Sequence, residues 1–228
     1  MFNRLRPLAA RLRQALTYRL ALDLTTLLAS FATVIALGLL IYDRRQQADI
    51  AAWTLLQTYL QANPRPRFNG GQNFALETLV QHGVDLFNLD GHDIVLDNAN
   101  LHGLKGDGAS FRKATLASVD LSGASLVRAN FEGASIVLCE CGGATFEYSN
   151  LTGASISGGT YLGVAFFGAD ISDLSFDVRP IDLAPDAFEH ACYRTGHPPH
   201  LPKQIRLPSA PQGIYCGAIN QKAWTPYP

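Results

Sequence analysis

The sequence predicts a repeat solenoid joined to an N-terminal membrane-spanning helix. Two observations support this prediction. From Leu96 to Phe176 a bulky apolar residue returns at every fifth position, a period that fits neither a helix nor a strand. Before this repeat, the segment from Leu24 to Tyr42 carries no charged residue at all.

The repeat can be divided into sixteen pentads centred on positions 101 to 176, and fourteen of the centres are large and apolar. The position two before the centre is Ala in nine pentads. The position just before the centre is usually short and polar, as in Asn100 and Asp120, which suits side-chain hydrogen bonds in tight turns. The inward-facing core is predicted to contain Leu101, Phe111, Leu116, Leu121, Leu126, Phe131, Ile136, Cys141, Phe146, Leu151, Ile156, Tyr161, Phe166, Ile171 and Phe176.

This pattern resembles the A(D/N)LXX motif of the pentapeptide repeat family. The resemblance implies a mainly β fold, a right-handed quadrilateral β-helix in which four pentads form one square coil. Sixteen pentads then give about four coils, and residues twenty apart stack, as in the ladder Leu126, Phe146 and Phe166. At Lys105–Ala109 the large and small positions are reversed by Leu104 and Gly106, and we expect this pentad to distort the first coil.

The uncharged segment is long enough to cross the hydrocarbon core of a bilayer, about 30 Å thick. We predict an uncleaved signal anchor rather than a cleaved signal peptide, because the segment is long and no convincing cleavage site follows it. Five arginines precede the first acidic residue, Asp23. This asymmetry favours a cytoplasmic N-terminus and an exported solenoid, which in a Gram-negative bacterium means an inner-membrane anchor and a periplasmic β-helix.

The chain therefore divides into five predicted segments. A basic cytoplasmic segment (1–19) and the transmembrane helix (20–42) come first. Residues 43–90 contain an amphipathic helix carrying Ile50, Trp53, Leu56 and Leu60, then a linker and a short helix that caps the solenoid. The β-helix follows (91–179), and a Pro-rich tail and cap (180–228) ends the chain. This order resembles a membrane-anchored member of the pentapeptide repeat family with a single N-terminal transmembrane helix.

Nine of the chain's 12 prolines lie in the last segment, which we expect to be extended. Its first part either folds back over the end of the solenoid or reaches a partner. The sequence offers four aromatic residues as partner anchors: Trp53, Tyr215, Trp224 and Tyr227.

The four cysteines form two pairs. Cys139 and Cys141 fall on inward-facing positions of one pentad, and we expect buried packing residues there. In an exported tail Cys192 and Cys216 could form a disulfide. Together with His190, His197 and His200 the tail cysteines are also zinc-ligand types, but their spacing fits no strong zinc pattern, so we predict no metal site.

No carboxylate pair, catalytic triad or cofactor fingerprint stands out, and we predict no catalytic residues, no cofactor and no enzymatic activity. A net charge of −1 gives no general attraction to nucleic acid. We expect a membrane-anchored interaction scaffold whose partners are membrane lipid and other subunits of a larger membrane complex, which it would help to assemble or stabilise. Two alternatives remain: a free envelope scaffold with an unknown ligand, and a DNA-mimicking gyrase-binding protein, as known for some members of this family. DNA mimicry requires a strongly acidic rod, whereas residues 96–176 contain eight acidic and four basic side chains.

Overall fold

The computed structural model describes residues 6–62, 70–177 and 183–206 of the 228-residue chain. The chain divides into two compact units, Met1–Ala48 and Asp49–Pro228, and each is described by itself. Tyr215, Cys216, Trp224 and Tyr227 lie outside the described residues.

The predicted span and the predicted helix after it are parts of one α-helix, α1 (Arg6–Gln61). Within the first unit, the large apolar side chains described from Leu24 to Tyr42 each expose between 54% and 68% of their surface. This part of α1 is long and apolar enough to cross a membrane by length and composition. A second helix, α2 (Gln72–Gln81), precedes the repeats.

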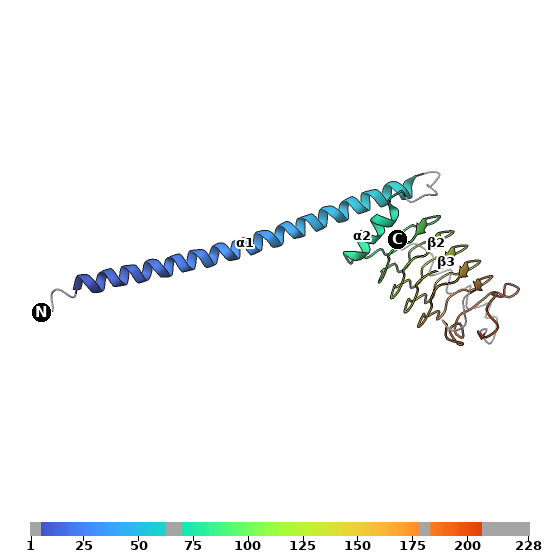
Figure 1. Ribbon diagram of the computed structural model, residues 1–228. Helices are drawn as coiled ribbons and strands as arrows, with labels where there is room; N and C mark the ends of the chain where they lie inside the picture. The colour runs from blue at the N-terminus through green and yellow to red at the C-terminus, as the bar shows by residue number, and fades with distance from the viewer. Residues whose placement is uncertain (1–5, 63–69, 178–182, 207–228) are drawn as a thin grey trace. The chain divides into compact units, whose positions relative to one another are not determined.

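The second unit is built around a parallel β-solenoid (Figure 1). Its five short strands lie in sequence order in one parallel sheet. Residues twenty apart pair, so Leu96, Leu116, Ile136, Ile156 and Phe176 stack, and four steps of this register carry the chain from β1 to β5. The strands are β1 (Val95–Asp97), β2 (Thr115–Ala117), β3 (Ser135–Val137), β4 (Ser155–Ser157) and β5 (Ser175–Asp177).

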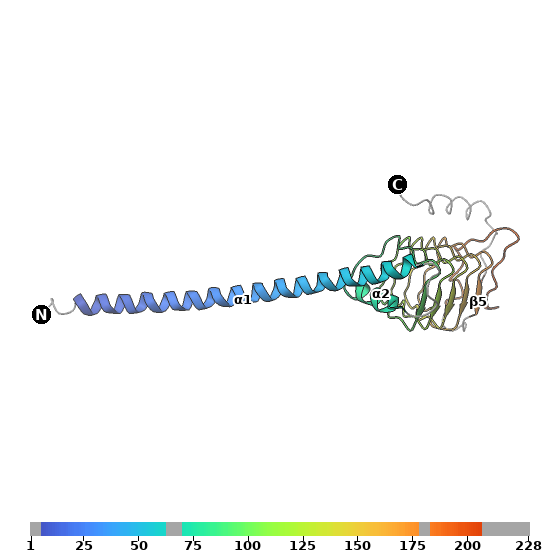
Figure 2. The ribbon, with the colours of Figure 1, turned by 90° about the horizontal axis from the view of Figure 1, so that it is seen from above.

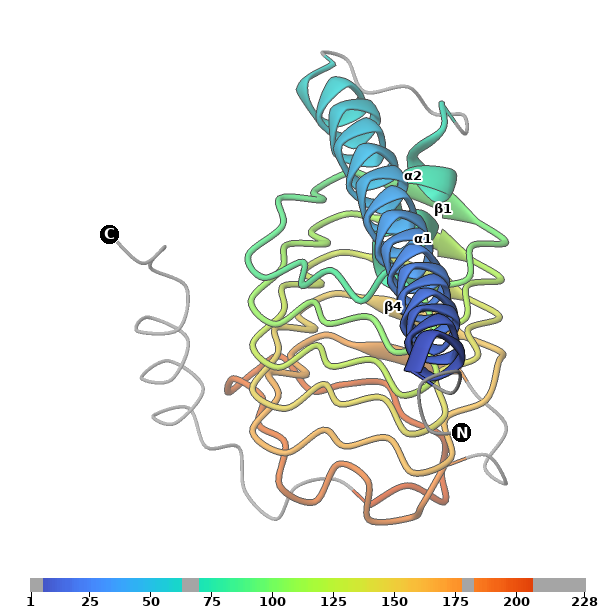
Figure 3. The same ribbon diagram turned by 90° about the vertical axis from the view of Figure 1, so that its left-hand side faces the viewer.

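The predicted β-helix of about four coils is confirmed by this register (Figure 3). Aromatic rings stack along its axis, with centroids 5.2 Å apart for Phe111 and Phe131 and 5.5 Å apart for Phe146 and Phe166. These spacings are those of favourable ring contacts. The ladders therefore fill the narrow core with side chains of similar shape.

The turns at the corners of the coils are stabilised by the short polar residue that precedes each pentad centre. The side-chain oxygens of Asn100, Asp120, Asn130, Asn150 and Asp170 each accept a hydrogen bond from the backbone N–H two residues later, at 2.9–3.1 Å. Such bonds stabilise tight turns because they satisfy a backbone donor that the turn would leave unpaired.

The expected distortion at Lys105–Ala109 is not found. The backbone N–H groups of Gly106 and Gly108 bond to the next coil at 2.8 Å, as in regular pentads. A Cβ added at Gly106 would lie 3.2 Å from the Leu126 side chain and 3.4 Å from that of Leu104. These two side chains therefore fill the space that the missing centre side chain leaves, and the backbone ladder is preserved.

We predict that Phe146→Asp unfolds the middle coils. Phe146 is 1% exposed, so the new carboxylate would be buried without a partner while its ring contacts are lost. The free energy of unfolding should fall by more than about 4 kcal/mol, measured by urea denaturation of the full chain in detergent. Thr145→Asp is the matched control, because Thr145 is half-buried and lies in the adjacent outward position. Equal effects of the two changes would contradict the assigned register.

Candidate functional site

The first coil of the solenoid has an edge strand, β1, whose backbone would be unpaired without a cap. Two amides at the start of α2 satisfy it. Gln72 Nε2 donates to the carbonyl of Val95 at 2.7 Å, and Asn73 Nδ2 donates to the carbonyl of Asp97 at 2.6 Å. The Gln72 side chain also accepts a hydrogen bond from the Gly70 backbone at 2.6 Å. The two buried amides thus replace the neighbouring strand that β1 lacks.

Two further side chains complete the edge. The backbone N–H of Val95 donates to the Tyr59 hydroxyl at 3.4 Å, and that of Asn100 donates to Glu77 Oε1 at 2.8 Å. Tyr59 lies at the end of α1 and Glu77 lies on α2. The end of α1 and α2 therefore act together as a polar edge cap, defined here as Tyr59, Gln72, Asn73 and Glu77.

Below the polar edge cap an apolar layer covers the open core. Leu56, Leu76 and Leu79 are at most 1% exposed and belong to the same cluster as the solenoid core. Trp53 packs against this cluster and is half-buried, so it contacts the protein's own core. Of the predicted stripe, Trp53, Leu56 and Leu60 pack against the core, whereas Ile50 is 66% exposed. Ala52 and Tyr59 are buried on the same helix, which the predicted stripe did not include.

The other end of the solenoid is closed by residues 183–206. Figure 2 shows α2 at one end of the stack of coils and β5 near the other. Beyond β5 the Phe188 ring lies 4.4 Å from that of Phe166 and 5.3 Å from that of Phe176, between ring centroids. Backbone pairing also continues, because Cys192 donates to Ala169 and accepts from Ile171, both at 2.8 Å.

A buried carboxylate fixes this C-terminal cap. Asp170 is fully buried, and its Oδ1 accepts hydrogen bonds from the backbone and hydroxyl of Ser172 at 3.0 and 2.6 Å. Its Oδ2 accepts from Arg194 Nη2 at 3.2 Å. A buried charge of this kind is tolerated only when it is paired and hydrogen-bonded. Arg194 thereby joins residues 183–206 to the last regular coil.

With both ends covered by the chain itself, the free surface of the solenoid is its sides. Five large apolar side chains of the described coils are exposed there: Phe87, Val137, Leu138, Leu162 and Phe167. The ring of Phe167 also lies 5.5 Å from those of Tyr148 and His190, between centroids. Sides of this kind, with small polar and scattered apolar groups, are suited to contact with another protein.

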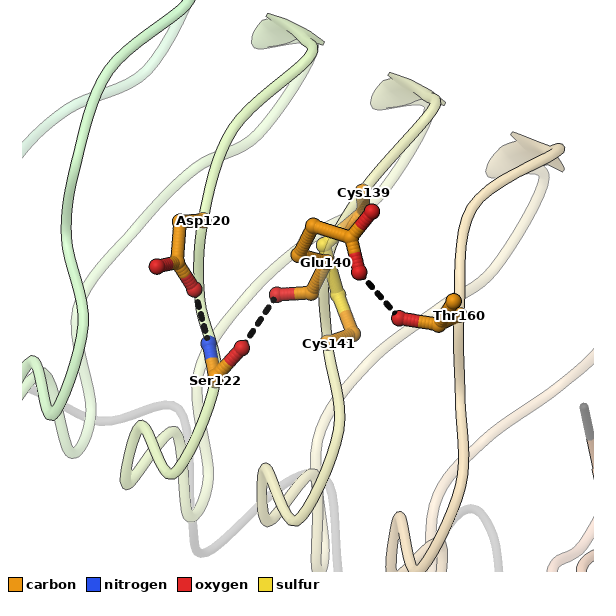
Figure 4. The surroundings of a disulfide bond; sticks show 6 residues. All are labelled: Asp120, Ser122, Cys139, Glu140, Cys141 and Thr160. Carbon is orange, nitrogen blue, oxygen red and sulfur yellow. Dashed lines mark hydrogen bonds between the residues drawn. A yellow bond between two sulfur atoms is a disulfide. The ribbon is translucent and has the colours of Figure 1, made fainter.

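The cysteines in the middle of the solenoid form a disulfide, Cys139–Cys141 (Figure 4). Both residues are completely buried, as predicted, but they are not the separate packing residues that we expected. Both positions of a pentad point inward, and their Cα atoms lie 5.4 Å apart, a normal distance for a disulfide. The signal available in the sequence was therefore the occurrence of Cys at both inward positions of one pentad.

The next coil, which contains Gly159 and Tyr161, packs closely against the backbone of the disulfide-bonded pentad. Gly159 has φ +84°, and a Cβ added there would lie 2.1 Å from the backbone oxygen of Cys139. Tyr161, two residues later, is the largest centre side chain and is 1% exposed. Burial raises the pKa of the Tyr161 phenol, and the nearby Glu140 carboxylate raises it further. The phenol therefore stays protonated in the core over the ordinary pH range.

All fifteen predicted core residues lie in the buried core, from Leu101 to Phe176. In the tail, Cys192 is disulfide-bonded. Because Cys216 lies outside the described residues, the pairing of these two cysteines stays a prediction. The same applies to Tyr215, Trp224 and Tyr227 as partner anchors.

The tail histidines have partners of other kinds. His197 Nδ1 lies 2.8 Å from Asp173 Oδ2, and the His190 ring packs against Phe167. Within residues 6–62, 70–177 and 183–206 there is no group of three or more His, Cys, Asp or Glu side chains that could hold a metal ion.

Sequence reasoning missed the polar edge cap and the Asp170–Arg194 pair. Gly70 to Asn73 lie where the predicted linker meets the predicted capping helix, and this position gives no sign that their amides bond to a strand. Arg194 lies 24 residues after Asp170, in a segment without the pentad pattern. Only the folded chain shows which groups these side chains reach.

We predict that Gln72→Leu destabilises the second unit by about 1–3 kcal/mol, because the Val95 carbonyl would be buried without a donor. Phe74→Ala is the matched control on the same helix, since Phe74 is 66% exposed and should change stability by about 0.5 kcal/mol or less. Thermal or urea unfolding checks both. A wild-type midpoint for Gln72→Leu would show that the amide does not stabilise the edge.

We predict that Gly159→Ala is far more costly than Gly143→Ala. Both glycines have positive φ, but a Cβ at Gly143 would meet nothing within 4 Å, whereas one at Gly159 would strike the Cys139 backbone. Gly143→Ala should cost about 1–2 kcal/mol for its left-handed backbone. Gly159→Ala should exceed about 4 kcal/mol because coils must separate. Comparable unfolding midpoints for the two variants would contradict the close approach.

Comparison with known proteins supports the repeat. The family of pentapeptide repeats matches residues 94–133 and 124–159, with 8 copies. A search of curated protein sequences finds no significant match.

Three solved structures share similarity with parts of the chain. HetL, a pentapeptide repeat protein involved in heterocyst differentiation regulation from the cyanobacterium Nostoc sp. strain PCC 7120, is 19% identical over 41% of this chain and 47% of its own, with a TM-score of 0.30. A pentapeptide repeat protein of the Arabidopsis thaliana thylakoid lumen is 26% identical over 40% of this chain and 66% of its own, with a TM-score of 0.18. QnrB1, a plasmid-mediated fluoroquinolone resistance protein, is 19% identical over 60% and 84%, with a TM-score of 0.22.

The chain thus spans about half the length of HetL, 47%. These similarities concern the repeat and carry no inference about activity. The twenty-residue register, the stacked core and the matched repeats agree with one another, and residues 94–159, with the β-helix they build, belong to the pentapeptide repeat family.

Proposed function

We propose that this protein is a non-enzymatic interaction scaffold held at a membrane by one helix. The observation that carries the proposal is the exposure of the apolar side chains from Leu24 to Tyr42, 54–68% each. A row of apolar side chains this long is unfavourable in water and requires an apolar environment. About 28 Å of helix, from 19 residues at 1.5 Å each, matches the hydrocarbon core of a bilayer.

The β-helix would lie on the non-cytoplasmic side of that membrane. Five arginines before Asp23 favour a cytoplasmic N-terminus. The Cys139–Cys141 disulfide supports the same orientation, because disulfides persist in oxidising compartments and are rare in the cytosol. In a Gram-negative bacterium this arrangement corresponds to an inner-membrane protein with a periplasmic solenoid.

The scaffold would act through the sides of the solenoid. Its two ends are covered by the polar edge cap and by residues 183–206, so β1 and β5 are shielded from pairing with another chain. Exposed Leu162 and Phe167, in consecutive pentads, offer apolar contacts on two neighbouring sides of the solenoid. A rigid surface of this kind, tethered to the membrane, suits an accessory subunit that stabilises or assembles a larger membrane complex.

We predict that the full chain stays in the membrane fraction after an alkaline carbonate wash, which removes peripheral proteins. The double variant Leu28→Asp, Ile35→Lys should lose this retention, because each charge costs about 2.5–3.5 kcal/mol at the centre of a membrane helix. Gln57→Lys is the control, since this exposed residue lies on α1 beyond the apolar segment. Release of the wild-type chain by carbonate would contradict the anchor.

The same membranes test the scaffold role. After extraction with a mild detergent, the chain should migrate on native electrophoresis with a larger assembly, whose subunits mass spectrometry identifies at constant stoichiometry. A variant with Leu162→Asp should leave that assembly while keeping its fold, because the Leu162 side chain is 73% exposed. Migration of the wild-type chain alone would contradict an accessory subunit and favour a free scaffold with another ligand.

A further inference from the structure

Two adjacent sides of the solenoid carry acidic but no basic side chains. One is the side of β1 to β5, with pentads centred on Leu96 to Phe176 in steps of twenty; the other is formed by the pentads that follow these, centred on Leu101 to Tyr161. We call these two sides the acidic face. Its acidic residues are Asp97, Asp120, Glu140 and Asp177. The Lys and Arg residues between positions 85 and 177 all lie on the other two sides: Lys105, Arg112, Lys113 and Arg128.

Within the described residues, the carboxylates of the acidic face form no ion pair. Acidic groups on the other sides are paired: Asp85 lies 3.0 Å from Lys105, and Glu132 lies 3.5 Å from Arg112. The negative charge of the acidic face is therefore not compensated by the described part of the protein itself.

Two of these carboxylates occupy equivalent positions of adjacent coils (Figure 4). Asp120 and Glu140 pair through their backbones, and such neighbouring strands are about 4.8 Å apart. Their side chains accept hydrogen bonds from uncharged donors, the backbone N–H of Ser122 and the hydroxyl of Thr160. Like charges on adjacent coils repel each other, so a cation placed beside them would be attracted to both.

A leucine with a strained backbone lies at the corner between the two sides, two residues before Glu140. Leu138 has φ +55°, in the left-handed region that glycine and asparagine adopt most easily. The residues stacked with it at this corner are Asn98, Ser118 and Gly158. Leu138 is the one aliphatic side chain among the described residues with positive φ, and it is 56% exposed. Neither its backbone conformation nor its exposure favours folding, which is the mark of a functional position.

Leu162 places a second apolar group on the other side of Glu140. Leu138 precedes the pentad of Glu140, and Leu162 lies near the end of the pentad stacked on it, with 73% of its side chain exposed. The fold also leaves room for Leu138, because a Cβ added at Gly158 would lie 2.8 Å from its side chain. The acidic face therefore presents apolar side chains on both sides of its carboxylates.

We propose that the acidic face binds a segment of a partner protein that carries Lys or Arg beside apolar side chains. This inference rests on the scaffold role proposed above and assigns its contact surface. The apolar groups of the segment would cover Leu138 and Leu162, and its cations would lie against Asp120 and Glu140. Buried apolar area would supply affinity, while complementary charge would select the partner.

The charge of the acidic face favours a protein over other occupants. Anionic lipid headgroups and nucleic-acid phosphates would be repelled by it. Its four carboxylates lie among Ser, Gly and apolar side chains, unlike the dense charge of DNA, one per about 1.7 Å of axis. A second copy of this chain is a poorer match, because two of the four basic residues on its coils already form ion pairs.

The first test removes the charges and keeps the turns. In the double variant Asp120→Asn, Glu140→Gln, the amide oxygens can accept the same hydrogen bonds, as Asn130 does at the equivalent position. The full chain is extracted from its native membrane in mild detergent, and size-exclusion chromatography of serial dilutions gives the concentration at which half of it has left the assembly. We expect this concentration to rise about fivefold at about 0.05 M salt, and the difference from wild type to shrink at about 0.5 M salt.

The matched control is Asp93→Asn, Glu147→Gln, which removes two charges from the other two sides. It should stay within about twofold of the wild type. Equal weakening by both double variants would show an effect of net charge and overturn the proposal. A wild-type value for Asp120→Asn, Glu140→Gln would also overturn it, while the assembly itself would still support the scaffold.

Leu138→Asn separates binding from folding. Asn98 has φ +56° at the same corner, so the variant should unfold at a urea concentration no lower than the wild type. The same change should weaken the assembly about tenfold, because an exposed apolar contact is lost. A less stable variant with an unchanged assembly would show that Leu138 serves the fold and would overturn the proposal.

The chemistry of the partner is read by photo-crosslinking in native membranes with the variant Leu162→benzoylphenylalanine. Mass spectrometry should identify a peptide of another protein in which Lys or Arg lies next to apolar residues, and Asp120→Asn, Glu140→Gln should reduce this product. Capture of lipid, of a second copy of this chain, or of a peptide without basic residues would overturn the proposal. Migration of the wild-type chain alone would contradict the scaffold role itself, so the two failures are distinguishable.

Discussion

The structure depends on one volume constraint: each pentad turns two side chains into a narrow core, and the stacked pentads must fill that core together. Ala beside a large centre residue is the common solution, as in Ala144 with Phe146, both at most 1% exposed. Other pairs fill the core differently, such as Leu104 with Gly106. Because the core is narrow, every coil must meet this constraint before the backbone ladder of the next coil can form.

Filling the core does not satisfy the backbone groups at the two ends of the solenoid. Stacked coils satisfy each other's backbone groups, but the first and last coils have no neighbour. At the first coil, side chains of Gln72 and Asn73 take the place of backbone donors. At the last, residues 183–206 pair as an irregular coil and add Phe188 to the aromatic ladder. The ends are therefore closed by different chemistry: amides at one end, and at the other an aromatic ring together with a buried carboxylate that pairs with Arg194.

Much of the fold could be predicted because the constraint repeats. The period of five placed the core residues correctly from Leu101 to Phe176, and the polar residue before each centre predicted the turn bonds seen at Asn130 and Asp170. The candidate site was less predictable. Gln72, Asn73 and Arg194 lie outside the repeat, so no periodic pattern identifies them. Gln72 and Asn73 bond to backbone carbonyls of β1, and Arg194 bonds to the Asp170 carboxylate; only the folded chain brings these distant groups together. The disulfide was missed because the period identifies inward positions without saying how the residues there interact.

The pair formed by Gly159 and Tyr161 also has an evolutionary consequence. A methyl group at position 159 would collide with the backbone below, and a smaller residue at position 161 would leave a cavity in the core. A single substitution at either position is therefore harmful, whereas a simultaneous change at both can preserve the filled volume. Across related sequences, substitutions at the two inward positions of such a coil should therefore be correlated.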